Sequence, residues 1–396
     1  MNLLSPEIQD YTANSSMIRK MFEAGIELKK QYGADQVFDF SLGNPDLAPP
    51  ASVKKALQDL VKTIDKPFSI GYMPNAGYAD TREVLAEKVS EEQQVKTPAS
   101  NIIVTCGAAG GLNIFFRAVL SPGDEVMCPS PFFVEYGFYA GNFGGKLVPV
   151  KTKLPSFSLD IAAMEKAITP KTRAVIINSP NNPTGQIYTQ KELKALATVL
   201  KKHTKLNGRT IYLISDEPYR FLNFDQAEIP SVFGLYDASV VIGSFSKSLS
   251  LAGERIGYVA VSPKLKGGEE LVSGLILTNR ILGFVNAPAI AQKIIKACIN
   301  SEVDMKIYSR RRDLMAKVLD EAGIDYTLPK GAFYFFPKSP VADESVFVNA
   351  LLKERVLAVP GRGFGLPGYF RLAFCVGEKT IARSAEAFKR AVKAVK

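Results

Sequence analysis

Between residues 100 and 262 the sequence alternates short runs rich in β-branched residues with amphipathic stretches at helical spacing. The predicted strands lie at residues 101–106, 125–129, 172–179, 210–215, 239–244 and 256–262. Strands that are apolar along almost their whole length occur in sheets covered on both faces, and such sheets are mostly parallel. The alternation therefore predicts an α/β domain in which a mostly parallel sheet is flanked by helices.

The rest of the chain of 396 residues follows a different pattern. Longer helical stretches and short strands follow residue 287, and an amphipathic helix is predicted around residues 16–32. One compact core rarely serves a chain of this length, so we predict two domains. The large domain covers residues 48–286, and a smaller α+β domain combines residues 1–47 with residues 287–396.

Composition and charge argue against several classes of function. No apolar run approaches the roughly 20 residues of a membrane-spanning helix, and the N-terminus lacks a secretion signal, so we expect a cytoplasmic protein. The formal net charge is +10, but the lysines are spread over amphipathic helices, which predicts neither nucleic-acid nor membrane binding. Four cysteines without C-x-x-C spacing argue against a zinc site. A single histidine, His203, argues against most Ser-His-Asp and Cys-His mechanisms.

Polar or glycine-rich segments follow four of the predicted strands. They are GAAGG at 107–111, NNPTG at 181–185, DEPYR at 216–220 and SFSK at 244–247. Ligands of open parallel sheets bind at the carboxyl ends of the strands, so we expect these segments along one edge of the sheet. The glycine-rich turn suits a phosphate group, although such a turn also opens helices that bind no ligand. Asp216 could cap the next turn, or it could face a protonated ring nitrogen of a cofactor.

Lys247 lies among serines, and Arg255 follows eight residues later. One interpretation is a serine acyl enzyme with the Ser244-x-x-Lys247 motif, but its partner motifs S-D-N and K-T-G are absent. Pyridoxal phosphate explains more of the sequence. Its aldehyde would react with Lys247, and its ring nitrogen would face Asp216. Its phenolate oxygen would be bound by Tyr219 and Asn182. Its phosphate would be bound by the turn at 107–109 together with Ser244 and Arg255.

In these motifs and in their order, the chain resembles the fold-type I pyridoxal-phosphate aminotransferases, the class I/II group that includes aspartate aminotransferase. The resemblance extends from SLGNPD at 41–46 to FRLAF at 370–374. It implies a seven-stranded sheet in the large domain. It also implies a cofactor held as an aldimine on Lys247, and a homodimer whose active sites are shared between the subunits.

The resemblance also implies roles for individual residues. Catalysis would fall to Lys247, Asp216 and Tyr219. The cofactor phosphate would be held by the backbones of Gly107, Ala108 and Ala109 together with Ser244, Arg255 and, from the neighbouring subunit, Tyr72. Phe133 would stack on the cofactor ring, Asn182 would contact its O3′ side, and Ser246 would be a small neighbour. The substrate carboxylate would be bound by Arg371, with Gly43 and Asn182 close to it.

The implied activity is transfer of an amino group between an L-amino acid and a 2-oxo acid in two successive half-reactions. The alternatives are a pyridoxal-phosphate-dependent β-C–S lyase that uses the same site, and a non-catalytic protein that binds the cofactor. Ala109 stands where some bacterial aspartate aminotransferases of this family have a lysine. No position clearly matches the interface arginine that binds a distal carboxylate in other aspartate aminotransferases. The sequence therefore does not predict the amino donor.

Overall fold

The computed structural model describes residues 3–13 and 17–396, which divide into two compact units. The large unit comprises Pro45–Met305 and Lys330–Ala332; the small unit comprises Met1–Asn44, Lys306–Pro329 and Phe333–Lys396. The sequence pattern changes near residue 287, whereas the large unit continues to Met305. It does so because helix α11 (Ala289–Cys298) packs against α3 (Ala51–Val61) and α4 (Ala79–Gln93).

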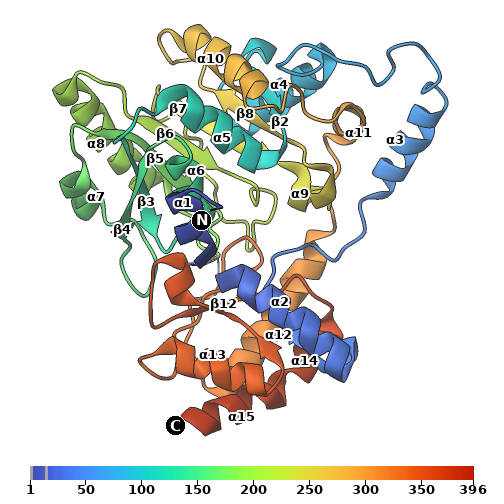
Figure 1. The fold of residues 1–396 in the computed structure, drawn as a ribbon, viewed down its shortest axis with the longest axis vertical. Coiled ribbons are helices and arrows are strands. Elements are labelled where there is room, and N and C mark those ends of the chain that lie inside the picture. Colours follow the sequence, from blue (N-terminus) through green and yellow to red (C-terminus); the bar gives the residue numbers. More distant parts are fainter. Residues whose placement is uncertain (1–2, 14–16) are drawn as a thin grey trace. The chain divides into compact units, whose positions relative to one another are not determined.

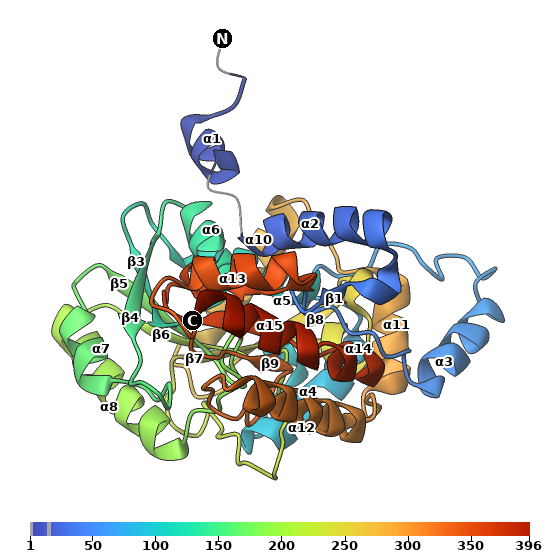
Figure 2. The ribbon, with the colours of Figure 1, turned by 90° about the horizontal axis from the view of Figure 1, so that it is seen from below.

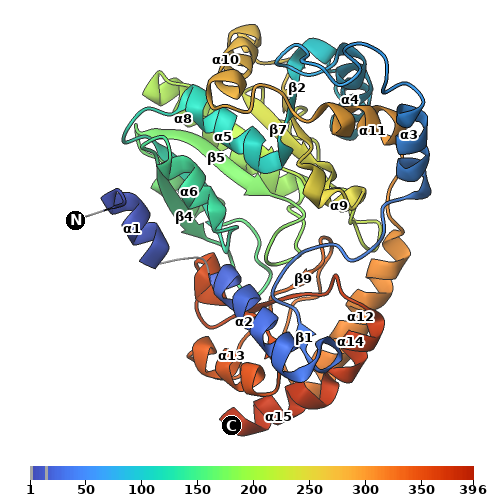
Figure 3. The same ribbon diagram turned by 45° about the vertical axis from the view of Figure 1, so that its right-hand side comes forward.

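A seven-stranded sheet forms the centre of the large unit (Figures 1 and 3). Its strands are β2 (Ile102–Thr105), β3 (Glu125–Ser130), β4 (Lys146–Lys151), β5 (Thr172–Asn178), β6 (Tyr212–Asp216), β7 (Ser239–Ser244) and β8 (Gly257–Val261). Their spatial order is β2-β8-β7-β6-β5-β3-β4, and only β8 runs antiparallel to its neighbours. The predicted α/β class with a mostly parallel sheet is confirmed.

The sequence pattern did not indicate β4, which lies at the edge of the sheet. It begins and ends with exposed lysines, Lys146 and Lys151, and contains Pro149, so it lacks the apolar run of the other strands. Proline is tolerated at a sheet edge because no further strand requires its missing N–H donor.

Helices flank this sheet. They are α5 (Gly107–Val119), α6 (Glu135–Gly141), α7 (Ile161–Ala167), α8 (Gln190–Asn207) and α10 (Gly268–Ile281). Helix α8 begins with a capping box between Thr189 and Glu192 and ends at Gly208 in the left-handed conformation. Two short helices, α9 (Phe245–Ser248) and η3 (Ala252–Glu254), connect β7 to β8, and η2 (Ala99–Asn101) precedes β2.

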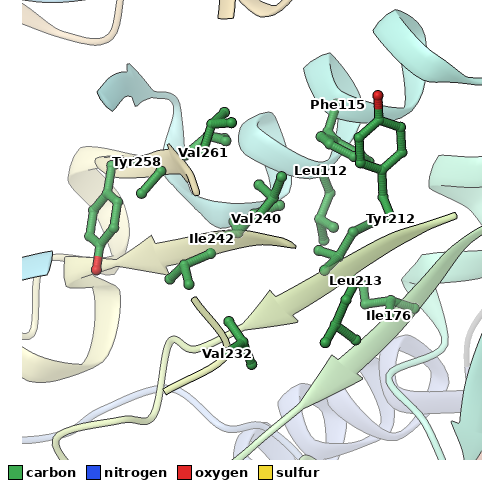
Figure 4. Close-up of a cluster of buried hydrophobic side chains, with 14 of the residues drawn as sticks. Leu112, Phe115, Ile176, Tyr212, Leu213, Val232, Val240, Ile242, Tyr258 and Val261 are labelled. Atoms are coloured by element: carbon green, nitrogen blue, oxygen red, sulfur yellow. The ribbon is translucent and has the colours of Figure 1, made fainter. Parts of the chain in front are cut away.

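Part of the core of the large unit lies between α5 and the strands (Figure 4). Leu112 and Phe115 of α5 reach the sheet, and the ring of Phe115 meets that of Tyr212 edge-on, with centroids 5.4 Å apart. Strands β2, β6 and β8 are buried at every position. A polar side chain at the end of such a strand therefore requires a partner or a ligand.

The small unit contains short strands and helices (Figure 2). Its helices are α1 (Pro6–Ala13), α2 (Met17–Tyr32), η1 (Ala34–Gln36), α12 (Met305–Ala322), α13 (Glu344–Lys353), η4 (Gly361–Phe364), α14 (Glu378–Arg383) and α15 (Ala385–Val395). Helix α2 corresponds to the helix predicted at 16–32, of which residue 16 lies outside the described residues.

Two small sheets complete this unit. Strand β1 (Phe38–Asp39) pairs in parallel with β10 (Val356–Leu357), and β11 (Val359–Pro360), β12 (Phe370–Ala373) and β9 (Tyr334–Phe335) form an antiparallel sheet. A connection that includes η4 leads from β11 to β12. No helix in the described part of either unit is long and apolar enough to cross a membrane.

Candidate active site

The four polar segments meet at one edge of the large-unit sheet. Asn178, at the end of β5, pairs in register with Asp216, at the end of β6. On the other side, Thr105 and Ser244 both pair with Gly257, so the ends of β2 and β7 share one row. The prediction that these segments lie along one edge of the sheet is confirmed.

The glycine-rich turn lies against Arg255. Gly107 opens α5 with φ of +71°, and a Cβ there would lie only 3.0 Å from Nη2 of Arg255. A Cβ on Gly257 would lie 2.7 Å from the carbonyl carbon of Gly107 and 2.9 Å from the amide nitrogen of Ala108. A helix N-terminus and a guanidinium in contact fit a phosphate group. The sequence did not single out Gly257, although only glycine allows β8 to approach this turn so closely.

Lys247 and its serines form the short helix α9 directly after β7. The Ser244 hydroxyl caps this helix by accepting from the amide of Ser246 at 3.1 Å, and it donates to the Ser246 hydroxyl at 2.9 Å. Lys247 is half-buried. Arg255 adopts a left-handed backbone conformation, with φ of +50°, and its Nη1 donates to the Ala252 carbonyl at 3.0 Å.

Asp216 is buried at the end of β6, with 5% of its surface exposed. Its Oδ2 accepts from the Tyr136 hydroxyl at 2.5 Å and from Nδ2 of Asn178 at 3.4 Å, whereas its Oδ1 has no hydrogen-bond partner among the described residues. The carboxylate therefore does not cap the next turn. Burial raises the pKa of Asp216 to about 7, while the bond from Tyr136 lowers that pKa and the charge of Glu217 raises it. A buried acceptor without a donor fits a cationic N–H group.

Asn178 links Asp216 to the NNPTG loop. Its Nδ2 donates to the Asp216 carbonyl at 2.8 Å, and its Oδ1 accepts from the Asn182 amide at 2.6 Å. Asn182 and Tyr219 are both buried at this edge. The sequence did not single out Asn178, although an amide side chain that ends an apolar strand is a usable signal.

Helix α6 approaches from the segment that follows β3. Its Tyr136, which the sequence did not single out either, is buried and donates to Asp216. The ring of Phe133 lies 5.6 Å from the Tyr136 ring at nearly a right angle. Phe133 therefore lies beside the Tyr136–Asp216 pair.

Tyr72 lies apart from this cluster in its own chain. Its side chain is 94% exposed, in the segment that follows α3 (light blue in Figure 1). It lines a surface cavity of about 290 Å³ with neighbours that include Ile70, Met73, Phe284 and Val285. Neither Asp216 nor its partners Tyr136 and Asn178 line this cavity.

The small unit holds the predicted carboxylate-binding residues. Arg371, on β12, is 2% exposed, and its guanidinium lies 4.8 Å from the ring centroid of Tyr334 and 4.7 Å from that of Phe364. Its Nη2 donates to the Ser41 carbonyl at 2.5 Å. A Cβ on Gly43 would lie 2.0 Å from the Tyr334 hydroxyl, so any larger residue there would displace the Tyr334 side chain. Tyr334 therefore brings Gly43 and Arg371 together.

Three comparisons place these features among known proteins. Residues 35–388 match the family described as aminotransferase class I and II. A probable aspartate/prephenate aminotransferase from Aquifex aeolicus is 32% identical over 374 residues, or 91% of this chain and 92% of that one. Aromatic-amino-acid aminotransferase 2 from Thermococcus litoralis is 30% identical over 390 residues, or 96% of each chain. The crystal structure of an aminotransferase from Eubacterium rectale superposes with a TM-score of 0.95 at 37% identity, covering 100% of this chain and 99% of that one.

Proposed function

The chain belongs to the class I and II family of aminotransferases, and from this premise we propose the roles of its active-site residues and the nature of its substrates. It is a fold-type I aminotransferase that depends on pyridoxal phosphate, as the sequence predicted. The predicted class of function, transamination, is therefore confirmed, and what remains to be proposed is how this chain carries it out.

We propose that the edge of the large-unit sheet holds the cofactor. The observation that carries this proposal is the buried Oδ1 of Asp216, which has no donor among the described residues and suits a protonated ring nitrogen. The turn at Gly107, Ala108 and Ala109 and the guanidinium of Arg255 would bind the phosphate, with the hydroxyls of Ser244 and Ser246 close by. Asn182 and Tyr219 would bind the oxygen on the ring, and Phe133 would cover the ring face.

Bound pyridoxal phosphate supplies an aldehyde and a ring that accepts the electrons released at the substrate Cα. Lys247 would hold the cofactor through its amine. The same amine would be the base that takes the proton from Cα of the amino acid. Asp216 would hold the ring nitrogen in its protonated form. Because one lysine serves as anchor and as proton carrier, the chain requires no catalytic histidine.

We propose that Arg371 binds the α-carboxylate of the substrate, with Gly43 in the adjoining loop. The rings of Tyr334 and Phe364 both contact its guanidinium and restrict its orientation. A guanidinium held in this way can bind a carboxylate by two parallel hydrogen bonds. This carboxylate is common to all amino acids and 2-oxo acids. Its recognition by Arg371 would therefore explain why one site accepts both substrates.

Arg371→Lys is expected to raise the Michaelis constant for the amino donor by more than about tenfold, because lysine keeps the charge but loses the planar pair of donors. Steady-state kinetics at saturating 2-oxo acid measures this effect. Arg310→Lys serves as the matched control, because Arg310 is exposed and its ion pair with Glu378 is on the surface. An unchanged Michaelis constant in Arg371→Lys would remove Arg371 from this role.

The amino donor is proposed only as a class, an L-amino acid with a free α-carboxylate. The two relatives compared are named for aspartate and prephenate and for aromatic amino acids, so acidic and aromatic side chains are the first to test. The test is a half-reaction screen in which single amino acids are added to the cofactor-loaded enzyme and the change in cofactor absorbance is followed. Release of pyruvate and ammonia from cystathionine without a 2-oxo acid would instead indicate the lyase.

We further propose that the protein acts as a homodimer. The segment 62–73 with the exposed side of α10 presents large apolar side chains to solvent, among them Phe68 (92% exposed), Ile70, Tyr72, Leu277 and Ile281. Apolar side chains gathered in this way are typical of an interface. In a dimer, the Tyr72 hydroxyl would reach the cofactor phosphate of the partner.

We also propose a cytoplasmic location, which is supported by four free cysteines.

Phe68→Glu is expected to shift the protein toward monomers, because the interface would then bury a charge. Sedimentation velocity measures the change, and Leu206→Glu, at an exposed apolar position on α8, is the matched control.

Tyr72→Phe should leave the dimer intact and weaken cofactor binding by roughly tenfold, the effect of losing one hydrogen bond to a charged group. Wild-type behaviour of both variants would contradict the shared site.

A further inference from the structure

The Tyr136 hydroxyl is completely enclosed and bonded to one oxygen of Asp216. Only 1% of the Tyr136 surface is exposed, and its Oη donates to Oδ2 of Asp216 at 2.5 Å. The two residues lie 80 positions apart in the sequence, on α6 and at the end of β6. The cofactor and substrate roles proposed above make no use of this tyrosine.

We propose that Tyr136 is a positioning residue that keeps the Asp216 carboxylate ionised and turned so that its other oxygen, Oδ1, serves the ring nitrogen of the cofactor. The inference rests on the proposed role of Asp216. It adds Tyr136 as an uncharged residue on which that role depends. Tyr136 itself need not touch the cofactor ring nitrogen.

The orientation of the Asp216 carboxylate follows from its hydrogen bonds, because donors in the described part of the chain reach only one of its two oxygens. Oδ2 accepts from Tyr136 at 2.5 Å and from Asn178 at 3.4 Å, and Oδ1 has no partner among the described residues. Asn178 is itself fixed, because its amide also donates to the Asp216 carbonyl and its oxygen accepts from the Asn182 amide. Rotating the carboxylate plane away from this position would break the short bond to Tyr136, whereas a half-turn only exchanges the two equivalent oxygens. Oδ1 is therefore left as the acceptor for a ligand.

The ionisation of the carboxylate depends on the same bond. Burial raises the pKa of Asp216, and the hydrogen bond from Tyr136 is the principal effect that opposes it. The pKa of Tyr136 is itself raised well above its ordinary value by burial, so the phenol stays a neutral donor at physiological pH. The other titratable groups that act on this pair are Cys128, Tyr139, Glu217 and Tyr219. None of them is a cation that could replace the donor.

A proton shared between the carboxylate and a ring nitrogen settles on the more basic of the two. Without the bond from Tyr136, Asp216 becomes the stronger base and retains the proton, so the ring nitrogen loses its charge. With the bond, the proton stays on the ring. Tyr136 would thus act on the reaction through Asp216, by setting the basicity of its carboxylate.

The first test uses the protein without cofactor, labelled with ¹³C at the aspartate carboxyl carbons. The Asp216 signal is identified by its loss in Asp216→Asn, and its titration midpoint is compared between wild type and Tyr136→Phe. We expect the midpoint to rise by about one pH unit or more in Tyr136→Phe, the effect of removing one hydrogen bond to a charged group. An unchanged or lower midpoint would overturn the inference.

The matched control is Tyr236→Phe. Tyr236 is also buried, and its hydroxyl donates at 2.7 Å to the Ile211 carbonyl, directly before the opposite end of β6. This variant loses the hydrogen bonds of the Tyr236 hydroxyl with the Ile211 carbonyl and the Thr204 hydroxyl but should leave the Asp216 midpoint unchanged. If Tyr136→Phe does not fold, incorporation of 3-fluorotyrosine at position 136 is the alternative variant. It retains the shape and strengthens the donor, so the midpoint should fall instead of rising, and a rise would count against the inference.

The second test records the ¹⁵N chemical shift of the ring nitrogen in protein loaded with ¹⁵N-labelled pyridoxal phosphate. We expect a pyridinium shift in wild type and Tyr236→Phe, and a shift toward neutral pyridine in Tyr136→Phe. If Asp216→Asn leaves the shift unchanged, the proposed role of Asp216 itself fails. If Asp216→Asn moves the shift but Tyr136→Phe does not, only the inference about Tyr136 fails.

Discussion

Lys247→Ala is expected to lower the rate of transamination by a factor of about 10⁴ or more while leaving a folded protein that still binds pyridoxal phosphate. The substitution removes the only group proposed both to anchor the cofactor and to carry the proton from Cα. The phosphate and ring-nitrogen sites are formed by other residues, so non-covalent binding should persist. Rapid mixing of the loaded protein with an amino acid measures the half-reaction directly.

Covalent attachment gives a second, independent measurement. Borohydride treatment of the wild-type protein should fix the cofactor on Lys247, as detected by mass spectrometry of its peptides, and no peptide of Lys247→Ala should carry it. Lys264→Ala is the control, because Lys264 is an exposed lysine of the same unit. Addition of a small primary amine should restore part of the lost rate, since it can move the proton in place of the lysine. Turnover near the wild-type rate in Lys247→Ala would end the assignment.

The residues that the sequence predicted share one property: each can be recognised from its immediate neighbours in the chain. Asp216 ends one apolar strand, Lys247 lies three residues beyond the end of the next one, and parallel strands end at the same edge of a sheet. Strand prediction alone was thus sufficient to place these side chains together. The class of fold followed from the same alternation.

The residues that the sequence did not indicate act across elements. Tyr136 occupies a helix, and its importance comes from a strand end 80 positions away. Gly257 matters because its missing Cβ makes room for the turn at Gly107, which is a property of packing. The extension of the large unit to Met305 likewise depends on the packing of α11 against α3 and α4. None of these contacts has a signature in the spacing of residues along the chain.

Asp216 is expected to have opposite effects on the stability of the cofactor-free protein and on the activity of the loaded enzyme. Burial raises its pKa to about 7, well above its value in an unfolded chain, which is near 4. Its contribution to stability is therefore fully present below about pH 4 and is lost as the pH rises through about 7. Above that pH the fold bears the cost of a buried carboxylate that lacks a counter-charge.

Asp216→Asn should consequently stabilise the cofactor-free protein above pH 7, by up to a few kcal/mol in the free energy of unfolding, with little effect at pH 4. The same variant should slow the amino-acid half-reaction by roughly 10²–10³-fold or more, because an amide cannot hold a charged ring nitrogen. Urea unfolding at several pH values and rapid-mixing kinetics measure the two effects. The matched control is Asp237→Asn, at an exposed aspartate before β7, which should change neither. If Asp216→Asn is stabilised but has wild-type kinetics, the carboxylate is buried for a reason other than catalysis. If the variant is both more stable and slower, the wild-type protein gives up stability at this position because the reaction requires a charge there.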